Sequence, residues 1–235
     1  MIEIKLRKYF PLIICFLAIT TLFLSCKNKD VPPATPAPTA LNVINAGADT
    51  INYYVNGTRQ NNLSSLYPQG ATGYTSVLSG AQNYQFKKAG SAVALFGVVD
   101  TLILKSYYSI FVTGETADKA FKTIDSLGAA STILSADTTF TTCMLRFIDA
   151  SPNAGSLNVN VGKGDTLNLK NRNFKFAGPF TKFTAGAKEV KISSSTASID
   201  TTLTLQSGSI YSLFTYGIVN GTGGKTFSVK LIINR

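Results

Sequence analysis

The chain has 235 residues, enough for two domains of about 100 residues each. Its residues are 45% hydrophobic and 14% charged, with a formal net charge of +10, so the composition argues against a disordered polymer. The chain contains no histidine, which excludes Ser-His-Asp and Cys-His catalysis and the usual Cys/His zinc sites.

Residues 1–25 are predicted to be a secretory signal. The first eight residues carry three basic side chains, and an apolar run from Tyr9 to Leu24 follows. The alternative is an uncleaved membrane anchor, but a spanning helix needs about 20 apolar residues, and this run is shorter.

The apolar run ends in Leu22-Phe-Leu-Ser-Cys26, which resembles the lipobox of bacterial lipoproteins. The resemblance implies that Ser25 ends the signal peptide and that Cys26 becomes a lipidated N-terminus. Lys27 follows instead of the aspartate that retains lipoproteins at the inner membrane. We therefore expect a cell-envelope lipoprotein at the outer membrane, facing either the periplasm or the outside.

Residues 26–40 are expected to be a tether. This segment has four prolines among small residues, which cannot bury a core and favour extended polyproline II structure.

Residues 41–139 and 140–235 are predicted to be two copies of one β-sandwich. The stretch Leu41–Val55 is a weaker copy of Met144–Val161, and later apolar positions match at a nearly constant offset. The matched pairs are Ile51 and Leu157, Val55 and Val161, Tyr74 and Phe180, Val77 and Phe183, Gly80 and Gly186, Phe86 and Ile192, and Tyr108 and Tyr211.

Alternating apolar residues predict an all-β fold of antiparallel sandwiches, Ig-like or prealbumin-like, with some seven strands in each copy. Leu157, Val159 and Val161 show this period of two, as does the run from Phe227 to Ile233. In each copy the first two strands are expected to pair and close one edge. Residues 115–127 have apolar residues at helical spacing, so a short helix is one alternative, but a loop before a strand at 132–136 is favoured.

The cysteines are expected to form no intramolecular disulfide. Cys15 leaves with the signal and Cys26 carries lipid, so Cys143 stands alone in the mature chain. Cys143 begins a predicted strand and is interpreted as a small buried apolar residue.

The segment Arg146-Phe-Ile-Asp-Ala-Ser-Pro-Asn-Ala154, with Leu157–Val161 and Tyr211–Phe214, resembles domain-of-unknown-function family 4397. The resemblance implies tandem β-sandwiches in lipoproteins or secreted proteins of Bacteroidetes and related bacteria, and it implies no agreed activity. Within the segment, Arg146 is expected to pair with Asp149 or with a neighbouring carbonyl. A structural role is favoured for these residues.

Basic side chains interleave with four phenylalanines between residues 170 and 183. Such a pattern can hold an anionic glycan or nucleic acid, and an extracytoplasmic location makes nucleic acid the least expected ligand. Alternatively, Phe174 and Phe176 point inward and the cations are simply the solvated face. The basic residues are Lys170, Arg172, Lys175 and Lys182.

Asp followed by Thr or Ser, and then by an apolar residue or Thr, recurs along the chain. The pattern resembles the O-glycosylation sequence of exported Bacteroidetes proteins, and it is equally how a turn leads into a strand. The candidate acceptors are Thr50, Thr101, Ser126, Thr138, Thr166 and Thr201.

Two functions remain open, and we expect no enzyme, metal or cofactor, because no acidic pair can be nominated for catalysis. The first is a lipid-anchored envelope protein with a non-catalytic binding, adhesion or scaffolding role, its partner being an envelope glycan or another surface protein. The alternative is a glycan-capturing module that supports polysaccharide uptake. The chain has no tryptophan to stack on sugars, but tyrosine can substitute.

Overall fold

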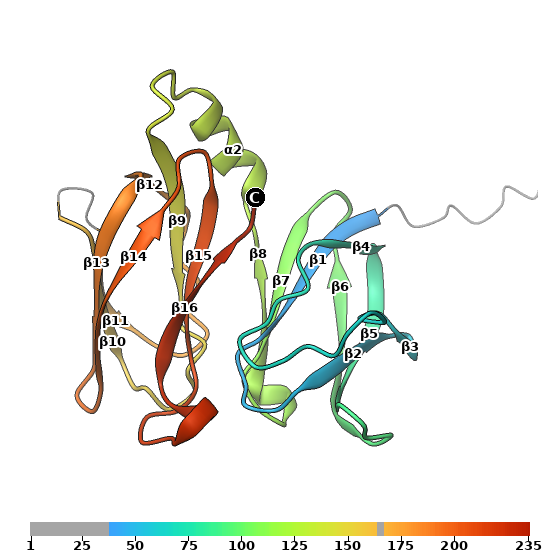
Figure 1. Ribbon diagram of the computed structural model, residues 1–235. Helices are drawn as coiled ribbons and strands as arrows, with labels where there is room; N and C mark the ends of the chain where they lie inside the picture. Colours follow the sequence, from blue (N-terminus) through green and yellow to red (C-terminus); the bar gives the residue numbers. More distant parts are fainter. Residues whose placement is uncertain (1–37, 164–166) are drawn as a thin grey trace, which may run out of the picture. The chain divides into compact units, whose positions relative to one another are not determined.

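The computed structural model describes residues 38–163 and 167–235 (Figure 1). The expected signal peptide, Cys26, nearly all of the tether and the candidate Thr166 lie outside this part of the chain. The described residues form four sheets of four strands each, with one short α-helix. The prediction of an all-β sandwich fold is confirmed.

The first sandwich consists of the sheets β4-β1-β7-β8 and β3-β2-β5-β6. Alternating side chains of both sheets enclose its core, which includes Val43, Tyr53, Tyr84, Phe86 and Ile110. Its strands are β1 (Pro38–Asn45), β2 (Ile51–Val55), β3 (Thr58–Arg59), β4 (Thr75–Leu78), β5 (Gly80–Lys88), β6 (Ala94–Leu102), β7 (Tyr107–Val112) and β8 (Ala120–Ile124).

The second sandwich consists of the sheets β12-β9-β15-β16 and β11-β10-β13-β14. Its core includes Leu145, Phe147, Val159, Val190 and Leu213. The elements after β8 are the helix α2 (Leu127–Ser135), the strands β9 (Thr142–Ile148), β10 (Leu157–Val161), β11 (Leu167–Arg172), β12 (Thr181–Thr184), β13 (Gly186–Ser193), β14 (Ser198–Leu205) and β15 (Ile210–Tyr216), the short 3₁₀ helix η3 (Gly223–Lys225) and the strand β16 (Ser228–Ile233).

The two sandwiches repeat the same topology. Each contains one parallel pair, β1 with β7 and β9 with β15, and every other pair of strands is antiparallel. The hydroxyl of Tyr108 accepts the Ile103 amide at 3.0 Å, and the hydroxyl of Tyr211 accepts the Gln206 amide at 2.8 Å. Each copy thus has eight strands rather than the predicted seven, with matched residues in matched places.

The predicted pairing of the first two strands of each copy is wrong. β1 and β2 lie in different sheets, as do β9 and β10. The turn after each opening strand carries the chain across the sandwich instead of forming a hairpin. β9 lies between β12 and β15, so both of its edges already have hydrogen-bonding partners.

The segment between the sandwiches also differs from the prediction. Instead of a loop, residues 117–119 form the short 3₁₀ helix η2 (Ala117–Lys119), and the chain then adds β8 to the edge of β7. The strand expected at 132–136 is wrong, because α2 occupies that position. Leu127 and Ala130, one turn apart on α2, pack on Met144 and Ile210, and this tertiary contact favours a helix there.

The strands β9 and β15 are buried on both faces, whereas the alternation of apolar and polar residues predicted one solvent-exposed face. All seven residues of β9 are buried. One face contributes to the core of the second sandwich, and the other contributes Ile148 to a cluster that also contains Ile44, Phe111 and Phe214. In β16 the side chain of Ile232 joins this cluster, while Val229 and Leu231 on the other face pack on the core of the second sandwich. Ile233, expected on that buried face, lies at the end of the strand and is 62% exposed.

Among the described residues, no helix is long and apolar enough to cross a membrane.

Candidate functional site

A buried ion pair joins the two sandwiches. The Nη1 atom of Arg146, on β9, lies 2.6 Å from the Oδ1 atom of Asp125, which follows β8. The two side chains are 2% and 0% exposed. Arg146 also donates from Nε to the Ser212 hydroxyl at 2.7 Å. The expected pairing of Arg146 with Asp149 is therefore wrong, because its carboxylate partner comes from the other repeat.

Hydroxyl groups complete the surroundings of Asp125. The Tyr74 and Ser109 hydroxyls donate to Oδ2 at 2.6 and 2.5 Å, and the Thr123 hydroxyl donates to Oδ1 at 2.8 Å. Burial, with the negative charge of Asp125 next in importance, raises the pKa of Tyr74 far above its ordinary value. Tyr74 therefore stays a donor, and Asp125 is satisfied by three hydroxyls and one guanidinium.

Each partner of the ion pair stands where the other copy has an asparagine: Arg146 corresponds to Asn42, and Asp125 corresponds to Asn234. Ser109 binds Asp125 in the first sandwich, and Ser212 accepts the Asn234 amide at 2.7 Å in the second. The register places Ser109 opposite Asn42 and Ser212 opposite Arg146. One copy has diverged to carry the cation and the other to carry the anion.

A small cavity of about 200 Å³ lies beside this pair, lined by residues of α2, β9 and the segment 178–180. The guanidinium of Arg146 stacks on the ring of Phe180 at 4.7 Å. Its Nη2 atom is buried and has no hydrogen-bond partner. Because Nη2 has almost no accessible surface, the pair is better suited to structure than to catalysis.

Asp149 is a second buried carboxyl in the turn after β9. Its Oδ1 atom accepts the Ser151 amide at 3.0 Å and the Thr215 hydroxyl at 2.8 Å, while its Oδ2 atom is buried without a partner. Burial raises the pKa of Asp149 to about 6, against the lowering effect of these two hydrogen bonds.

Asn45 holds the equivalent place in the first sandwich. Its Oδ1 atom accepts the Gly47 amide at 3.1 Å, as Asp149 accepts Ser151. Its Nδ2 group donates to the carbonyls of Asp49 and Leu66 at 2.7 and 2.9 Å. The unpartnered oxygen of Asp149 thus corresponds to an amide donor in the other copy.

The predicted basic site is spread over both sheets of the second sandwich. Lys170 and Arg172 lie on β11, and Lys182 lies on β12 in the opposite sheet. Arg172 is half-buried over the ring of Phe176 at 4.8 Å, and the ammonium of Lys175 lies 5.5 Å from the ring of Phe174. Two of the four cations therefore already have aromatic partners within the molecule.

The candidate glycosylation sites lie in varied environments. Thr101, Ser126 and Thr138 are exposed, whereas Thr50 and Thr201 are half-buried. Ser126 follows the buried Asp125, and Thr138 follows Asp137, whose carboxylate organises the turn before β9. The neighbouring aspartates thus have structural roles at two of the five described sites.

The first sandwich has an opening along the edge of β2. β3 has only two residues, and residues 61–65 then leave the sheet before Leu66 bridges to Ile51. In the second sandwich the six-residue β11 covers the same edge of β10. This opening consists of two hollows of about 250 and 390 Å³ that share Gln60 as a wall. We call it the amide groove, after its side chains Asn56, Gln60, Asn61, Asn62 and Gln82.

Comparison with known families bears on the second sandwich. Residues 143–230 match the family model described as Domain of unknown function (DUF4397). The second sandwich is similar to the DUF4397 family. The matched stretch begins on β9 and ends on β16, so it covers most of both sheets of that sandwich. No curated protein matches the chain.

Sequence reasoning missed both the Arg146–Asp125 pair and the amide groove. The only sequence signal for the pair was an arginine within a strand whose neighbours are all apolar, since such a strand is buried on both faces. The amide groove corresponds to no sequence motif, because it results from the different lengths of β3 and β11. Within residues 38–163 and 167–235, no three acidic or cysteine side chains gather where they could share a metal ion.

Proposed function

We propose that this protein is a lipid-anchored cell-envelope protein whose joined sandwiches bind or scaffold another surface macromolecule without catalysis. The observation that carries the proposal is the junction between the repeats. There, Phe111 packs on Phe214 with ring centroids 5.6 Å apart, and the buried Arg146–Asp125 pair links the same two sandwiches. Because this contact is apolar and desolvated, it favours one stiff body over two independently moving domains.

The anchor is supported by the sequence alone. The basic start, the apolar run and Cys26 in a lipobox-like context resemble a bacterial lipoprotein signal, and the proline-rich segment suits a tether. We propose the outer membrane of a Bacteroidetes-type bacterium as the location, with lipid on Cys26. The cations Lys170 and Lys182, both exposed, are the candidate contacts for an anionic partner.

The anchor is tested with a Cys26→Ala variant expressed in the native host. We expect the parent protein to partition into the detergent phase of a Triton X-114 extract and the variant into the aqueous phase, because only the thiol can carry the diacylglycerol. A variant that still partitions with its parent contradicts the anchor. The intact mass of the parent also shows whether glycans are added at the Asp-Thr/Ser sites.

The alternative function, glycan capture in support of polysaccharide uptake, is favoured by the amide groove. Amide and hydroxyl groups both donate and accept hydrogen bonds, as sugar hydroxyls require. This candidate places the binding site in the first sandwich, away from the basic residues of the second.

A further inference from the structure

We infer that the amide groove binds an uncharged glycan chain, an inference that deepens the second of the two proposed functions. The side chains that line the two hollows are amides, hydroxyls and apolar groups, and none is ionisable except the buried phenol of Tyr53. In a chain with net charge +10, a groove lined by no lysine or arginine offers an anion no cationic side chain. Its polar groups instead match the hydroxyls of a neutral sugar.

Several polar groups of the groove are free to bind a ligand. The Asn62 amide and the Thr58, Ser64 and Ser76 hydroxyls line the hollows and make no hydrogen bond with any described residue. The Gln60 amide donates to the Thr58 carbonyl at 2.9 Å, which leaves its oxygen open. A ligand would therefore find donors and acceptors that need not be taken from the fold.

Other amides hold the groove in shape. The Asn61 side chain accepts the Tyr53 amide at 3.1 Å and donates to the Asn52 side chain and the Ser64 carbonyl, both at 3.0 Å. On the other hollow, Asn56 donates to Gln82 and accepts the Asn83 amide at 2.9 Å. These bonds order the loop before a ligand arrives, which reduces the entropy lost on binding.

The adjacent cation is already engaged within the fold. The Nη2 atom of Arg59 donates to the Asn52 side chain at 2.8 Å, and Arg59 does not line either hollow. The rim instead carries Leu63, whose side chain is fully exposed. An apolar rim beside uncharged polar groups suits a sugar ring, which has an apolar face and polar edges.

The second sandwich provides an internal control. There Leu167 is buried and Leu169 packs on the core, so β11 closes the edge that residues 60–66 leave open in the first sandwich. Asn168 on β11 is an exposed amide that lines neither hollow of the amide groove. The amide groove therefore follows from the short β3 and the residues after it, not from a requirement of the fold that both sandwiches share.

The test uses the full-length chain in detergent, screened on an array of defined neutral and anionic oligosaccharides and then titrated with the neutral hexasaccharides that it retains. We expect retention of neutral glycans. A Gln60→Ala/Asn62→Ala variant should bind about tenfold more weakly or worse, since it loses two hydrogen-bonding side chains. The matched control Asn168→Ala should bind as the parent does, and circular dichroism should show all three proteins folded.

Three results would overturn the inference. The first is retention of no neutral glycan, and the second is equal weakening by Asn168→Ala and by the groove variant. Binding of anionic glycans alone, lost in a Lys170→Ala/Lys182→Ala variant, would likewise move the site to the second sandwich. None of these results affects the detergent partitioning of the Cys26→Ala variant, so failure of the groove and failure of the anchor are distinguishable.

Discussion

At the scale of single residues, the two repeats show how an asparagine and an aspartate differ in the same turn. Asn45 and Asp149 occupy equivalent turns and accept equivalent amides through Oδ1. The Nδ2 group of Asn45 donates to two carbonyls, whereas the Oδ2 atom of Asp149 accepts no hydrogen bond. A buried acceptor without a partner favours the protonated carboxyl, consistent with the raised pKa of Asp149.

We therefore predict that Asp149→Asn stabilises the protein at neutral pH. In the parent, the folded pKa of about 6 exceeds the unfolded value, so the folded state binds the extra proton. Stability should then fall as pH rises from about 4 to about 6, by roughly 2–3 kcal/mol.

The stability of the Asp149→Asn variant should lack this pH dependence. Its free energy of unfolding in urea should exceed that of the parent at pH 8 and differ little from it at pH 4. A variant less stable than its parent at pH 8 would contradict the assignment. Thr215→Val is the control that removes the hydrogen bond from Thr215 to Oδ1 of Asp149, and it should destabilise the protein at both pH values.

At the scale of elements, a single carboxylate organises the connection from α2 to β9. The Oδ1 atom of Asp137 accepts the Thr139 amide and hydroxyl at 3.1 and 2.6 Å. Its Oδ2 atom accepts the amides of Thr141 and Thr142 at 3.1 and 3.0 Å. The hydroxyls of Thr139 and Thr142, followed by the amides of the same two residues, hold the pKa of Asp137 well below its usual range.

We predict that Asp137→Asn loosens one side of this turn only. An asparagine side chain can accept through one atom, so either the Thr139 side or the Thr141–Thr142 side loses its acceptor. Hydrogen exchange should speed up at one side's amides and stay slow at the amides inside β9, such as that of Phe147.

Protonation of Asp137 should have a related effect in the parent. Because its folded pKa is lowered, the stabilisation is present above the unfolded pKa near 4 and is lost as pH falls below it. Unchanged exchange at residues 139–142 in Asp137→Asn would contradict this role.

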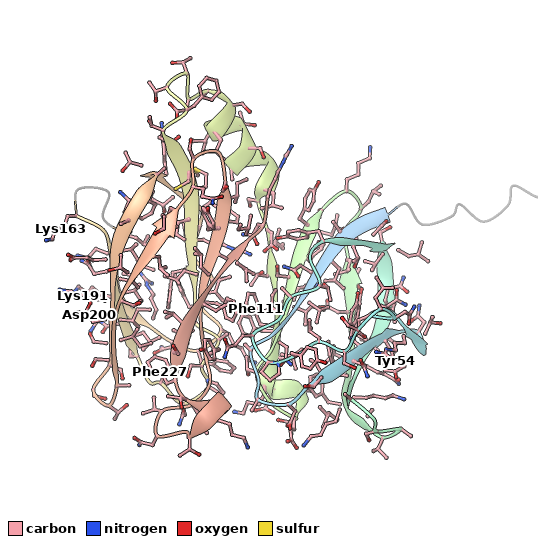
Figure 2. The ribbon with its side chains drawn as sticks, viewed as in Figure 1. Tyr54, Phe111, Lys163, Lys191, Asp200 and Phe227 are labelled. Carbon is pink, nitrogen blue, oxygen red and sulfur yellow. The ribbon has the colours of Figure 1, made fainter. Side chains whose placement is uncertain are left out.

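At the scale of the whole molecule, the duplicated sandwiches are joined by residues in which the two copies differ. Arg146 and Asp125 supply opposite charges from the two copies, and Phe111 contacts both Phe121 and Phe214. Phe111 is labelled in Figure 2, which also shows Lys191 beside Asp200 on a solvent-facing sheet. The two ion pairs differ in burial, so they should differ in energy.

We predict strong coupling between Arg146 and Asp125 in a double-mutant cycle. Arg146→Met or Asp125→Asn alone should destabilise the full chain by about 3–5 kcal/mol, because each leaves a desolvated polar partner. The double variant should be destabilised by much less than the sum of the destabilisations of the two single variants.

A control cycle on Lys191 and Asp200, which lie 3.8 Å apart and are mostly exposed, should give a coupling within about 1 kcal/mol. Urea unfolding followed by tyrosine fluorescence measures both cycles. Additive effects at Arg146 and Asp125 would contradict the view that this pair joins the sandwiches.

The sequence by itself determined the β-sandwich class, the repeat and the burial of Cys143, because period-two alternation and turn residues act locally. It predicted matched strand positions correctly, including the turn glycines Gly80 and Gly186, whose φ angles are 90° and 107°. Only the tertiary structure decided which strands pair, since a turn of similar residues can close a hairpin or cross to another sheet. It also decided the partner of Arg146, α2 in place of a strand, and the amide groove, because each depends on contacts between residues distant in the chain.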